Sequence, residues 1–495
     1  YYYVFSYSGL TMNQQRVLVL GASGHIGQNL IPALIAQGHQ VTAGARRVDW
    51  MMSQGWQNTR CVFVDLHDPK TLRDVIRNTD IVYYLVHSMG DAHNLIEQER
   101  QAALNVVDAL EESDVKQIIF LSALQHKDQP YSPHLVARKL TGEVLRTSSI
   151  PVTEIRTSMI VGPGSAAFEI MRDMVYNLPI LTPPRWVRSK SSPIALKNLI
   201  YYLTEIIHHP THQHRIFDAG GPEYISYQTL FERFINISGK KRLLIPLPIP
   251  ASIISAGFIS LITSVPTSIA KELIQGLKYD LPAKDASLRK LIPQKLISFD
   301  DAVRETLADE EAALDDQDWG YSPEVRNRWK PGYGYYPKNA GCTVSTPASA
   351  AALWHVVQQI GGEQGYFYGN ALWKTRALLD DLVGNKVTYG RPQRETLALG
   401  DMIDGWRVIK LEPEKQLTLL FGMKAPGLGR LSFTIHDSGN LRSLDVRAWW
   451  HPAGFSGLLY WFAMMPAHLF IFKGMAQTIS TYAYRLDKNS PKKPD

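Results

Sequence analysis

A glycine-rich turn near the start of this 495-residue chain constrains its fold more than any other feature. The motif Gly21-Ala-Ser-Gly24-His-Ile-Gly27 directly follows an apolar run at 17–20 and opens a helical pattern at 26–37. In a phosphate-binding turn, the first glycine makes the tight turn, the second lets a pyrophosphate approach the backbone, and the third lets the helix pack on the strand. The free N–H groups at the helix start attract the anion. The motif therefore predicts a nucleotide site.

The surrounding sequence alternates short apolar runs with helical patterns from residue 16 to residue 161. Further strands are expected at 41–43, 61–64, 81–86, 118–121 and 152–155. Helices are expected between them at 71–77, 94–111 and 135–147. Buried strands alternating with helices imply right-handed crossovers and a parallel sheet. We therefore expect an α/β fold with a doubly wound parallel sheet.

The end of the second strand bears on the choice of nucleotide. Arg46 and Arg47 stand where an NAD-selective site would carry an acidic residue for the ribose diol. Arginine can instead pair with a 2′-phosphate, so the sequence favours NADP(H), with NAD(H) left open. Asp65 and Leu66 end the third strand, where a carboxylate could accept a hydrogen bond from the adenine amino group. Asp65 could equally cap the following helix.

These residues resemble the atypical extended short-chain dehydrogenases/reductases, in particular the NmrA-like and complex-I-subunit-like branches. The resemblance covers about residues 16–304 and includes the strand end at Val86 and His87, the segment around Ser122, and Gly142-Glu143. It implies a Rossmann-type domain over residues 12–330, with a substrate lobe from about 162. It also implies a set of cofactor-binding residues: Gly21, Ser23, Gly24, His25, Ile26, Gly27, Arg46, Asp65, Leu66, Val86 and His87.

The catalytic residues implied by the resemblance are incomplete in this chain. Active members use a tyrosine and a lysine four residues later, with a serine on the preceding strand. Ser122 fits the serine, and His134 and Arg138 occupy one tyrosine–lysine frame. A second frame, counted back from Gly142-Glu143, places Leu135 at the tyrosine and Lys139 at the lysine, so neither frame supplies the tyrosine. His134 could replace the phenol as proton donor, because imidazole titrates near neutral pH. Arg138 could hold the ribose and phosphate, but it could not shuttle a proton. Alternatively, both are polar helix residues of a degenerate site, so the sequence leaves catalysis open.

A second domain is expected beyond a Gly/Pro/Tyr-rich linker at 331–340. Its pattern is a helix around 353–360, strand candidates at 395–399, 406–411, 416–421, 429–436 and 441–450, and a closing helix from about 457. This α+β pattern over 341–485 resembles an uncharacterised family with a START-like helix-grip fold, which implies an apolar ligand. We expect residues 1–11 to be an extension outside the fold and residues 486–495 to be a polar tail.

Composition limits the partners. The 52 basic and 46 acidic residues give a net charge of +6 without a basic block, so no nucleic acid is expected. Two cysteines exclude a disulfide framework, and reduced thiols fit a cytoplasmic protein. The histidines between 208 and 214 lack a familiar ligand spacing, so no metal site is expected.

Two stretches without charge, 243–270 and 452–472, exceed the roughly 18 residues of a membrane-spanning helix. Both contain proline. We expect them to pack inside their domains. The alternatives are peripheral contact with a membrane or the binding of an apolar ligand.

Three functions follow as hypotheses. The first is an NADP(H)-dependent oxidoreductase acting on a small, apolar carbonyl or quinone-like compound that the C-terminal domain binds or delivers. The second is an NADP(H)-sensing binding module without catalysis. The third is an assembly factor for a membrane complex. The sequence leaves the oligomeric state open.

Overall fold

The structure is a computed structural model that describes residues 14–87, 95–111, 113–125, 132–246, 261–308, 314, 319–320, 322–330, 332–373, 390–394, 396–422, 425–437 and 442–489. The chain divides into two compact units. The first comprises residues 1–175, 179–260 and 265–309, and the second comprises 176–178, 261–264 and 310–495. The expected extension at 1–11 lies outside the described residues.

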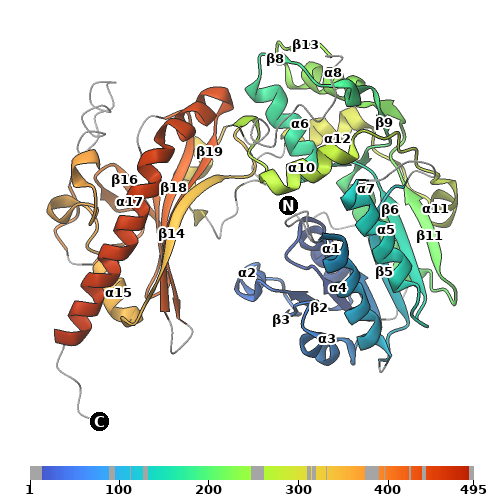
Figure 1. Cartoon of the computed structure of the whole chain (residues 1–495), viewed down its shortest axis with the longest axis horizontal. Helices are drawn as coiled ribbons and strands as arrows, with labels where there is room; N and C mark the ends of the chain where they lie inside the picture. The colour runs from blue at the N-terminus through green and yellow to red at the C-terminus, as the bar shows by residue number, and fades with distance from the viewer. Residues whose placement is uncertain are drawn as a thin grey trace. The chain divides into compact units, whose positions relative to one another are not determined.

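The first unit is built on a seven-stranded parallel sheet with the order β11-β6-β5-β4-β1-β2-β3 (Figure 1). From β1 the chain winds outward to β3, and from β4 it winds outward in the opposite direction. The predicted doubly wound, Rossmann-type fold is therefore confirmed. The strand order reverses between β1 and β4, and ligands of such sheets bind at this point, outside the carboxyl ends of the strands. The strands are β1 (Arg16–Leu20), β2 (Gln40–Ala45), β3 (Thr59–Phe63), β4 (Ile81–Tyr84), β5 (Gln117–Ala123), β6 (Val152–Thr157) and β11 (Arg215–Ala219).

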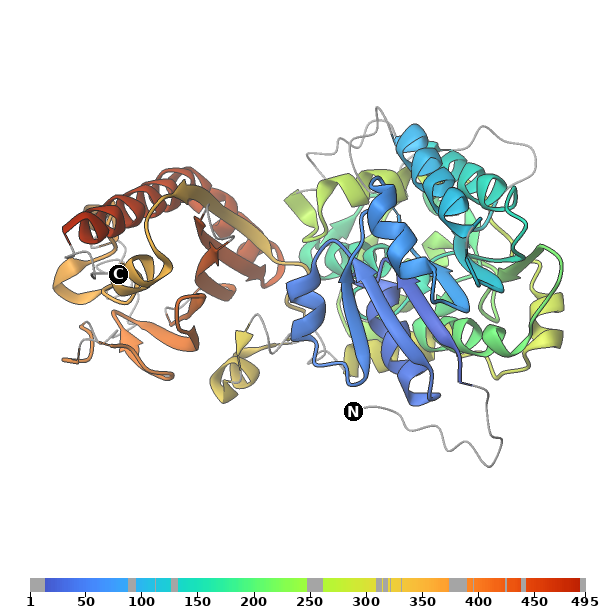
Figure 2. The ribbon, with the colours of Figure 1, turned by 90° about the horizontal axis from the view of Figure 1, so that it is seen from below.

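Helices cover both faces of this sheet (Figures 1 and 2). The buried side chains of β1 alternate, since Val17 and Val19 join one core while Leu18 and Leu20 join the other. The first core includes side chains of α1 and α7, and the second includes side chains of α3, α4 and α5. These helices are α1 (His25–Ala36), α3 (Pro69–Ile76), α4 (Leu95–Leu110), α5 (Pro133–Leu145) and α7 (Leu196–Glu205), with the short α2 (Val48–Ser53) after β2.

The rest of the first unit forms a lobe of short elements after β6. Its helices are α6 (Ala166–Asn177), α8 (Tyr227–Ser238), α10 (Thr267–Gly276), α11 (Ala286–Leu291) and α12 (Phe299–Ala308). Its strands are β7 (Ile160–Val161), β8 (Ile180–Leu181), β9 (Lys190–Ser191), β10 (Ile194–Ala195), β12 (Ile225–Ser226) and β13 (Leu243–Leu244).

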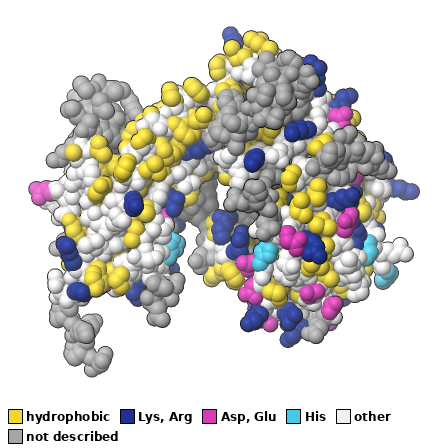
Figure 3. All heavy atoms as spheres, in the orientation of Figure 1, with side chains coloured by type: hydrophobic (Ala, Val, Ile, Leu, Met, Phe, Trp, Pro, Cys, Tyr) yellow, Lys and Arg dark blue, Asp and Glu magenta, His cyan; other side chains and the backbone are white. Residues whose placement is uncertain are grey.

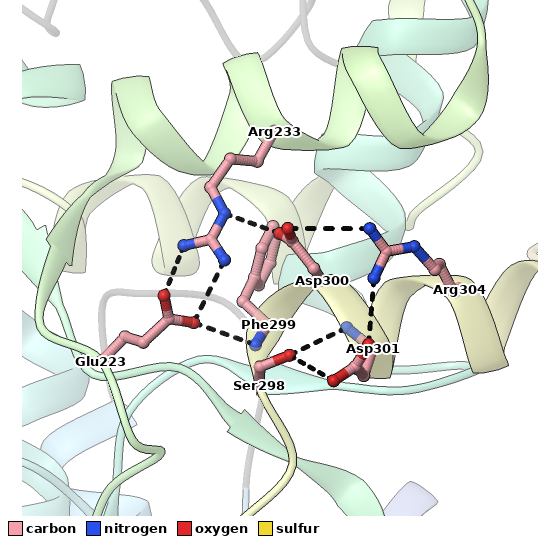
Figure 4. A network of polar contacts seen from close by, with 7 residues as sticks. All are labelled: Glu223, Arg233, Ser298, Phe299, Asp300, Asp301 and Arg304. Carbon is pink, nitrogen blue, oxygen red and sulfur yellow. Dashed lines mark hydrogen bonds and ion pairs between the residues drawn. The ribbon is translucent and has the colours of Figure 1, made fainter.

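A network of ion pairs fastens α12 to α8 in this lobe (Figure 4). The Arg233 guanidinium on α8 donates to Glu223 at 2.5 Å and to Asp300 on α12 at 2.6 Å. The same Glu223 carboxylate accepts from the backbone N–H of Phe299 at 3.1 Å. Because one guanidinium serves carboxylates from two segments, the start of α12 is fixed against α8.

The second unit contains a six-stranded antiparallel sheet with the order β14-β19-β18-β17-β16-β15. Helices α15 (Ala350–Val357) and α17 (Gly454–Asn489) pack on one face, where Leu353, Trp461 and Met475 join the side chains of the sheet in one core. This confirms the predicted α+β arrangement of helices on an antiparallel sheet. The strands are β14 (Lys338–Thr346), β15 (Met402–Ile403), β16 (Trp406–Glu412), β17 (Gln416–Phe421), β18 (Gly427–Asp437) and β19 (Arg442–Pro452).

The edges of this sheet differ from the prediction. Residues 396–399 form no strand, and β14 occupies residues that overlap the expected linker. β14 is small and polar, but it pairs with β19 along its whole length, from Lys338 opposite Trp450 to Thr346 opposite Arg442. Its hydrogen bonds therefore come from a partner about a hundred residues later, which local patterning does not reveal.

The boundary between the units also lies earlier than the expected position near residue 330. Trp319 and Trp329, on either side of α14 (Pro323–Arg328), pack with Leu420 and Leu428 of the second sheet. These buried contacts place Trp319, α14 and Trp329 in the second unit. At the other end, α17 continues through residues 486–489, which were expected to be part of a polar tail.

Candidate functional site

The glycine turn lies between the carboxyl end of β1 and the exit of β4. Gly21 has a φ of +89°, and a β-carbon there would lie 3.0 Å from the backbone of Leu85 and Val86. A β-carbon at Gly27 would lie 2.6 Å from the Gly21 carbonyl oxygen, so only glycine lets α1 start this close to the turn. The Gly24 N–H donates to the Gly21 carbonyl at 2.9 Å and closes the turn.

The start of α1 fits an anionic ligand. Its N-cap is Gly24, no side chain caps the helix, and its first turn carries no acidic residue. The first N–H groups of α1 therefore have no side-chain acceptor, and the helix dipole favours a phosphate there. Burial lowers the pKa of His25 to about 4, so its imidazole adds no charge at neutral pH. This arrangement fits the pyrophosphate of a dinucleotide.

The two arginines after β2 differ in their surroundings. Arg47 donates to the Ser23 carbonyl at 3.1 Å and lies 5.2 Å from the centre of the Trp50 ring. Arg46 is exposed, and no residue in the described part of the chain forms a hydrogen bond or ion pair with its side chain. Arg46 is therefore the arginine that is free to meet a 2′-phosphate.

The end of β3 settles one alternative left open by the sequence. Asp65 does not cap the next helix, because Asp68 is the N-cap of α3 and accepts from the Lys70 N–H at 3.1 Å. The Asp65 side chain instead accepts from the His67 N–H at 3.0 Å. Leu66 is buried, and its carbonyl accepts from Asn105 on α4 at 2.7 Å.

A second group of polar side chains gathers at the carboxyl ends of β4 and β5. Its centre is Glu99 on α4, which is 1% exposed. The Glu99 carboxylate accepts from Arg138 at 3.1 Å and from Thr141 at 3.2 Å. Its other oxygen lies 3.3 Å from His87 Nδ1, and the rings of His87 and His134 are 4.5 Å apart. The structure thus brings together three residues that the sequence singled out, around an acid that it did not.

Glu99 was missed because it was read only as part of a helix. The signal was present, since Glu99 lies on the apolar stripe that Leu95, Ala102, Ala103 and Val106 form on α4. A carboxylate on the buried face of a helix requires a partner inside the protein.

Arg138 has contacts that differ from the expected ribose-binding role. Its two amino groups donate to the carbonyls of Val86, at 3.0 Å, and Leu121, and one of them also reaches Glu99. Its guanidinium lies 4.7 Å from the centre of the Phe120 ring, and its side chain is only 5% exposed. In this structure Arg138 ties β4, β5 and α4 together, and a contact with ribose would require some of these bonds to break.

His134 also differs from the expectation of a group that titrates near neutral pH. Burial, followed by the neighbouring His87 and Arg138, lowers the pKa of His134 to about 3. Burial likewise lowers the pKa of His87. Both rings are therefore neutral at pH 7, and an imidazolium is not available as the proton donor. Since the carboxylate of Glu99 only accepts, it places the His87 proton on Nδ1.

Three buried polar atoms in this group have no partner among the described residues. They are Ser122 Oγ, His87 Nε2 and His134 Nδ1. A buried polar atom without a hydrogen bond costs roughly 1–3 kcal/mol. Ser122 lies on β5, His87 follows β4 and His134 lies in the first turn of α5, and three such atoms close together suit a ligand with polar atoms of its own.

Comparison with known families supports the nucleotide site. Residues 21–173 match a family described as NAD(P)H-binding. The predicted NAD(P)-binding, Rossmann-type domain is therefore confirmed. Residues 340–475 match a family described as a protein of unknown function (DUF2867), which leaves the START-like resemblance as a prediction.

Individual relatives are distant. The chain is 24% identical over 166 residues to bifunctional pinoresinol-lariciresinol reductase 1 of Thuja plicata, covering 30% of this chain and 51% of the relative. It is 24% identical over 187 residues to photosystem II assembly factor Ycf39 of Synechocystis sp., covering 37% and 54%. The chain thus spans about half the length of these relatives. A similar solved structure is triphenylmethane reductase of Citrobacter sp. complexed with NADP(H), with 18% identity, a TM-score of 0.49 and coverage of 59% and 100%.

Proposed function

We propose that this protein is an NADP(H)-dependent oxidoreductase that acts on a small, apolar, quinone-like or carbonyl compound. The observation that carries the proposal is the buried group of Ser122, His87 and His134, at the same sheet edge as the phosphate-binding turn. Bound NADP(H) supplies the hydride, Ser122 and His134 would hold the polar atom of the substrate, and His87 would lie beside them. The apolar surroundings would exclude water.

The cofactor contacts follow from the turn and from β2. Gly24 would let the pyrophosphate approach the backbone, the N–H groups of His25 and Ile26 would hold it, and Arg46 would pair with the 2′-phosphate. Ser23, Gly21 and Gly27 would shape the turn. Asp65 and Leu66 would contact the adenine, and Val86 and His87 would line the nicotinamide side.

The neutral histidines favour a quinone-like substrate within this class. Ser122 Oγ–H, and His134 where its Nδ1 carries the proton, would donate a hydrogen bond to the substrate oxygen. Hydride transfer to an aliphatic ketone leaves an alkoxide that needs a strong proton donor. Transfer to a quinone leaves a phenolate, which is a more stable anion. A site without an imidazolium or a tyrosine–lysine pair is therefore better suited to a quinone.

The second unit would bind the same apolar compound. Tyr366 and Trp373 stack with ring centres 4.4 Å apart, and Trp406 lies beside Trp373 at 6.3 Å. The indole N–H groups of both tryptophans are buried without a partner among the described residues. A cyclic apolar compound with an acceptor oxygen fits such surroundings.

A non-catalytic NADP(H)-sensing module is the second candidate. It is favoured by Arg138, whose bonds to the backbone and to Glu99 leave it unavailable to substrate. A role in assembling a membrane complex is compatible with this reading, since one relative is a photosystem II assembly factor.

Cofactor titration tests the shared premise. NADPH and NADH are titrated into the wild type, Arg46→Ala and the control Arg60→Ala, in which another exposed arginine is removed, and nicotinamide fluorescence is followed. Loss of a charge-assisted pair of roughly 1.5–3 kcal/mol should weaken NADPH binding about tenfold to a hundredfold and leave NADH binding unchanged. Equal NADPH affinities in Arg46→Ala and wild type would remove the 2′-phosphate assignment.

Turnover then separates the two candidates. NADPH oxidation is measured with a panel of quinones and ketones in the wild type, Ser122→Ala and His134→Ala. Quinone turnover that falls in both variants while NADPH affinity persists supports the oxidoreductase. Tight NADPH binding without oxidation of any compound would favour the sensing module.

A further inference from the structure

Helix α17 of the second unit exposes an apolar face. No charged residue occurs in it between Gly454 and Phe472. Along this half, the exposed residues recur every three or four positions, as Phe455, Leu459, Ala463, Pro466 and Phe470. Phe455, Leu459 and Phe470 are 52%, 61% and 70% exposed. In Figure 3, hydrophobic side chains gather over the upper part of α17, and Lys and Arg side chains appear lower along it.

The opposite face of α17 is packed on the antiparallel sheet. Trp461, Ile471, Phe472 and Met475 are buried in the core of the second unit. By length and hydropathy α17 could cross a membrane, but only 28% of its most apolar 18-residue window is buried. The apolar stretch at 452–472 is expected to pack inside its domain, and only the face of α17 that lies on the sheet does so. Since the packed face is occupied by the sheet, the helix would lie along a membrane surface rather than span it.

Two neighbouring residues widen the exposed patch. The ring of Tyr368 lies against Gly474, where a β-carbon would clash with it, and Gly369 approaches Ile471. Tyr368 and Leu372 are both about half exposed. With Phe455, Leu459, Leu469 and Phe470 they form what we call the α17 patch.

The charges that follow the patch along α17 are mostly positive. The first is Lys473, which is exposed on the same face one turn after Phe470, and Arg485 and Lys488 follow. The one acidic residue of α17, Asp487, accepts from the Ser349 N–H at 2.5 Å and from its hydroxyl at 2.7 Å. The exposed face of α17 is therefore apolar in its first half and cationic in its second half.

We propose that the α17 patch is a docking surface for a lipid bilayer with anionic headgroups. The apolar side chains enter the boundary between headgroups and acyl chains, and Lys473 reaches a lipid phosphate while its stem stays on the apolar surface. Arg485 and Lys488 add attraction to the anionic surface. A lipid surface matches both halves of the face, whereas a purely apolar protein partner would match only the first.

Vesicle sedimentation with the full chain tests this proposal. The vesicles contain phosphatidylcholine alone or phosphatidylcholine with about 30% phosphatidylglycerol, which makes their surface strongly anionic. We expect binding to the anionic vesicles that weakens with salt. Leu469→Glu/Phe470→Glu should lower the partition coefficient about tenfold or more, because it places charge where apolar atoms enter the lipid. Lys473→Glu should lower binding to anionic vesicles alone.

Matched variants keep the outcome interpretable. Leu243→Glu changes an equally exposed leucine of the first unit and should leave vesicle binding unchanged. Phe455→Glu/Leu459→Glu tests the other end of the patch if the first double variant unfolds. NADPH affinity and thermal unfolding report on folding. Failure of the wild type to bind anionic vesicles overturns the proposal, as does equal binding by the patch variants. A dimer that the patch variants dissociate, without vesicle binding, would assign the face to a second copy of the chain.

Discussion

Replacing Glu99 by glutamine tests whether the buried polar group is held together by its charge. The substitution keeps the shape of the side chain but removes the negative charge that faces Arg138. It also puts an NH2 group where the carboxylate accepts from Arg138 and Thr141 or faces His87. Where this NH2 group faces Arg138 or Thr141, one donor would meet another donor, and in either orientation of the amide the buried guanidinium would lose its counter-charge.

The magnitude follows from burial. Both side chains of the Glu99–Arg138 pair are at most 5% exposed. Removing one partner of a buried pair costs about 3–5 kcal/mol. A domain of this size shifts its melting temperature by roughly 2–4 °C per kcal/mol, so we expect the first unit to melt about 10 °C lower.

The control lies on the same helix. Glu97 pairs with Arg100 at 3.0 Å, but both side chains are about half exposed. Glu97→Gln should change stability by no more than about 0.5 kcal/mol, because water already screens that pair. Calorimetry and urea unfolding of wild type, Glu99→Gln and Glu97→Gln give the comparison directly.

A double variant completes the cycle. Glu99→Gln/Arg138→Met removes both charges and should be more stable than Glu99→Gln alone, since no uncompensated ion remains buried. If Glu99→Gln costs no more than Glu97→Gln, or if the second substitution gives no recovery, the reasoning from a buried ion pair is wrong.

Further predictions concern the turn and acid stability. Gly21→Ala should abolish NADPH binding in a fluorescence titration, because its β-carbon would meet the backbone of Leu85 and Val86. The control is Gly38→Ala, at a similar φ of +85° but with open space around it. This variant should lower the free energy of unfolding by about 1 kcal/mol and still bind NADPH. The pKa of His134 falls to about 3 in the folded protein. As the pH is lowered, the unfolded protein therefore protonates this side chain before the folded protein does. Its contribution to stability is therefore complete above about pH 6.5 and is lost as pH falls toward 3, at roughly 1.4 kcal/mol per pH unit. In urea unfolding at pH 7 and pH 5, His134→Gln should lose less stability than the wild type, and an equal loss would contradict the burial of this ring.

The first unit was predictable because its signals are local. The central parallel strands are buried on both faces and carry their own apolar runs, as at β1 and at β4, where all four residues are buried. The connections are short helices with their own periodicity. The cofactor turn is one contiguous motif, so the sequence placed it on the correct strand and helix.

The remaining features depend on distant contacts. β14 has few apolar residues and is a strand only because β19 pairs with it. The sequence places Trp319 and Trp329 in the first domain, because it does not reveal that they pack against Leu420 and Leu428. The pKa of His134 on α5 depends on burial and on His87, which follows β4 and is distant in the sequence, so local patterning predicts an imidazole that titrates near neutral pH.

The bonds of Arg138 connect these observations to function. In the family that this chain resembles, a lysine at this position holds the ribose. Its single charge lies at the end of a flexible side chain. Arginine offers five donors in a fixed plane, and in this chain they are directed at the Val86 and Leu121 carbonyls and at Glu99. A lysine could not make these contacts at once, so Arg138→Lys should loosen the ends of β4 and β5 rather than improve catalysis. The contacts of Arg138 therefore stabilise the site in this chain, and we propose that recognition of the cofactor rests on the turn at Gly21–Gly27 and on Arg46.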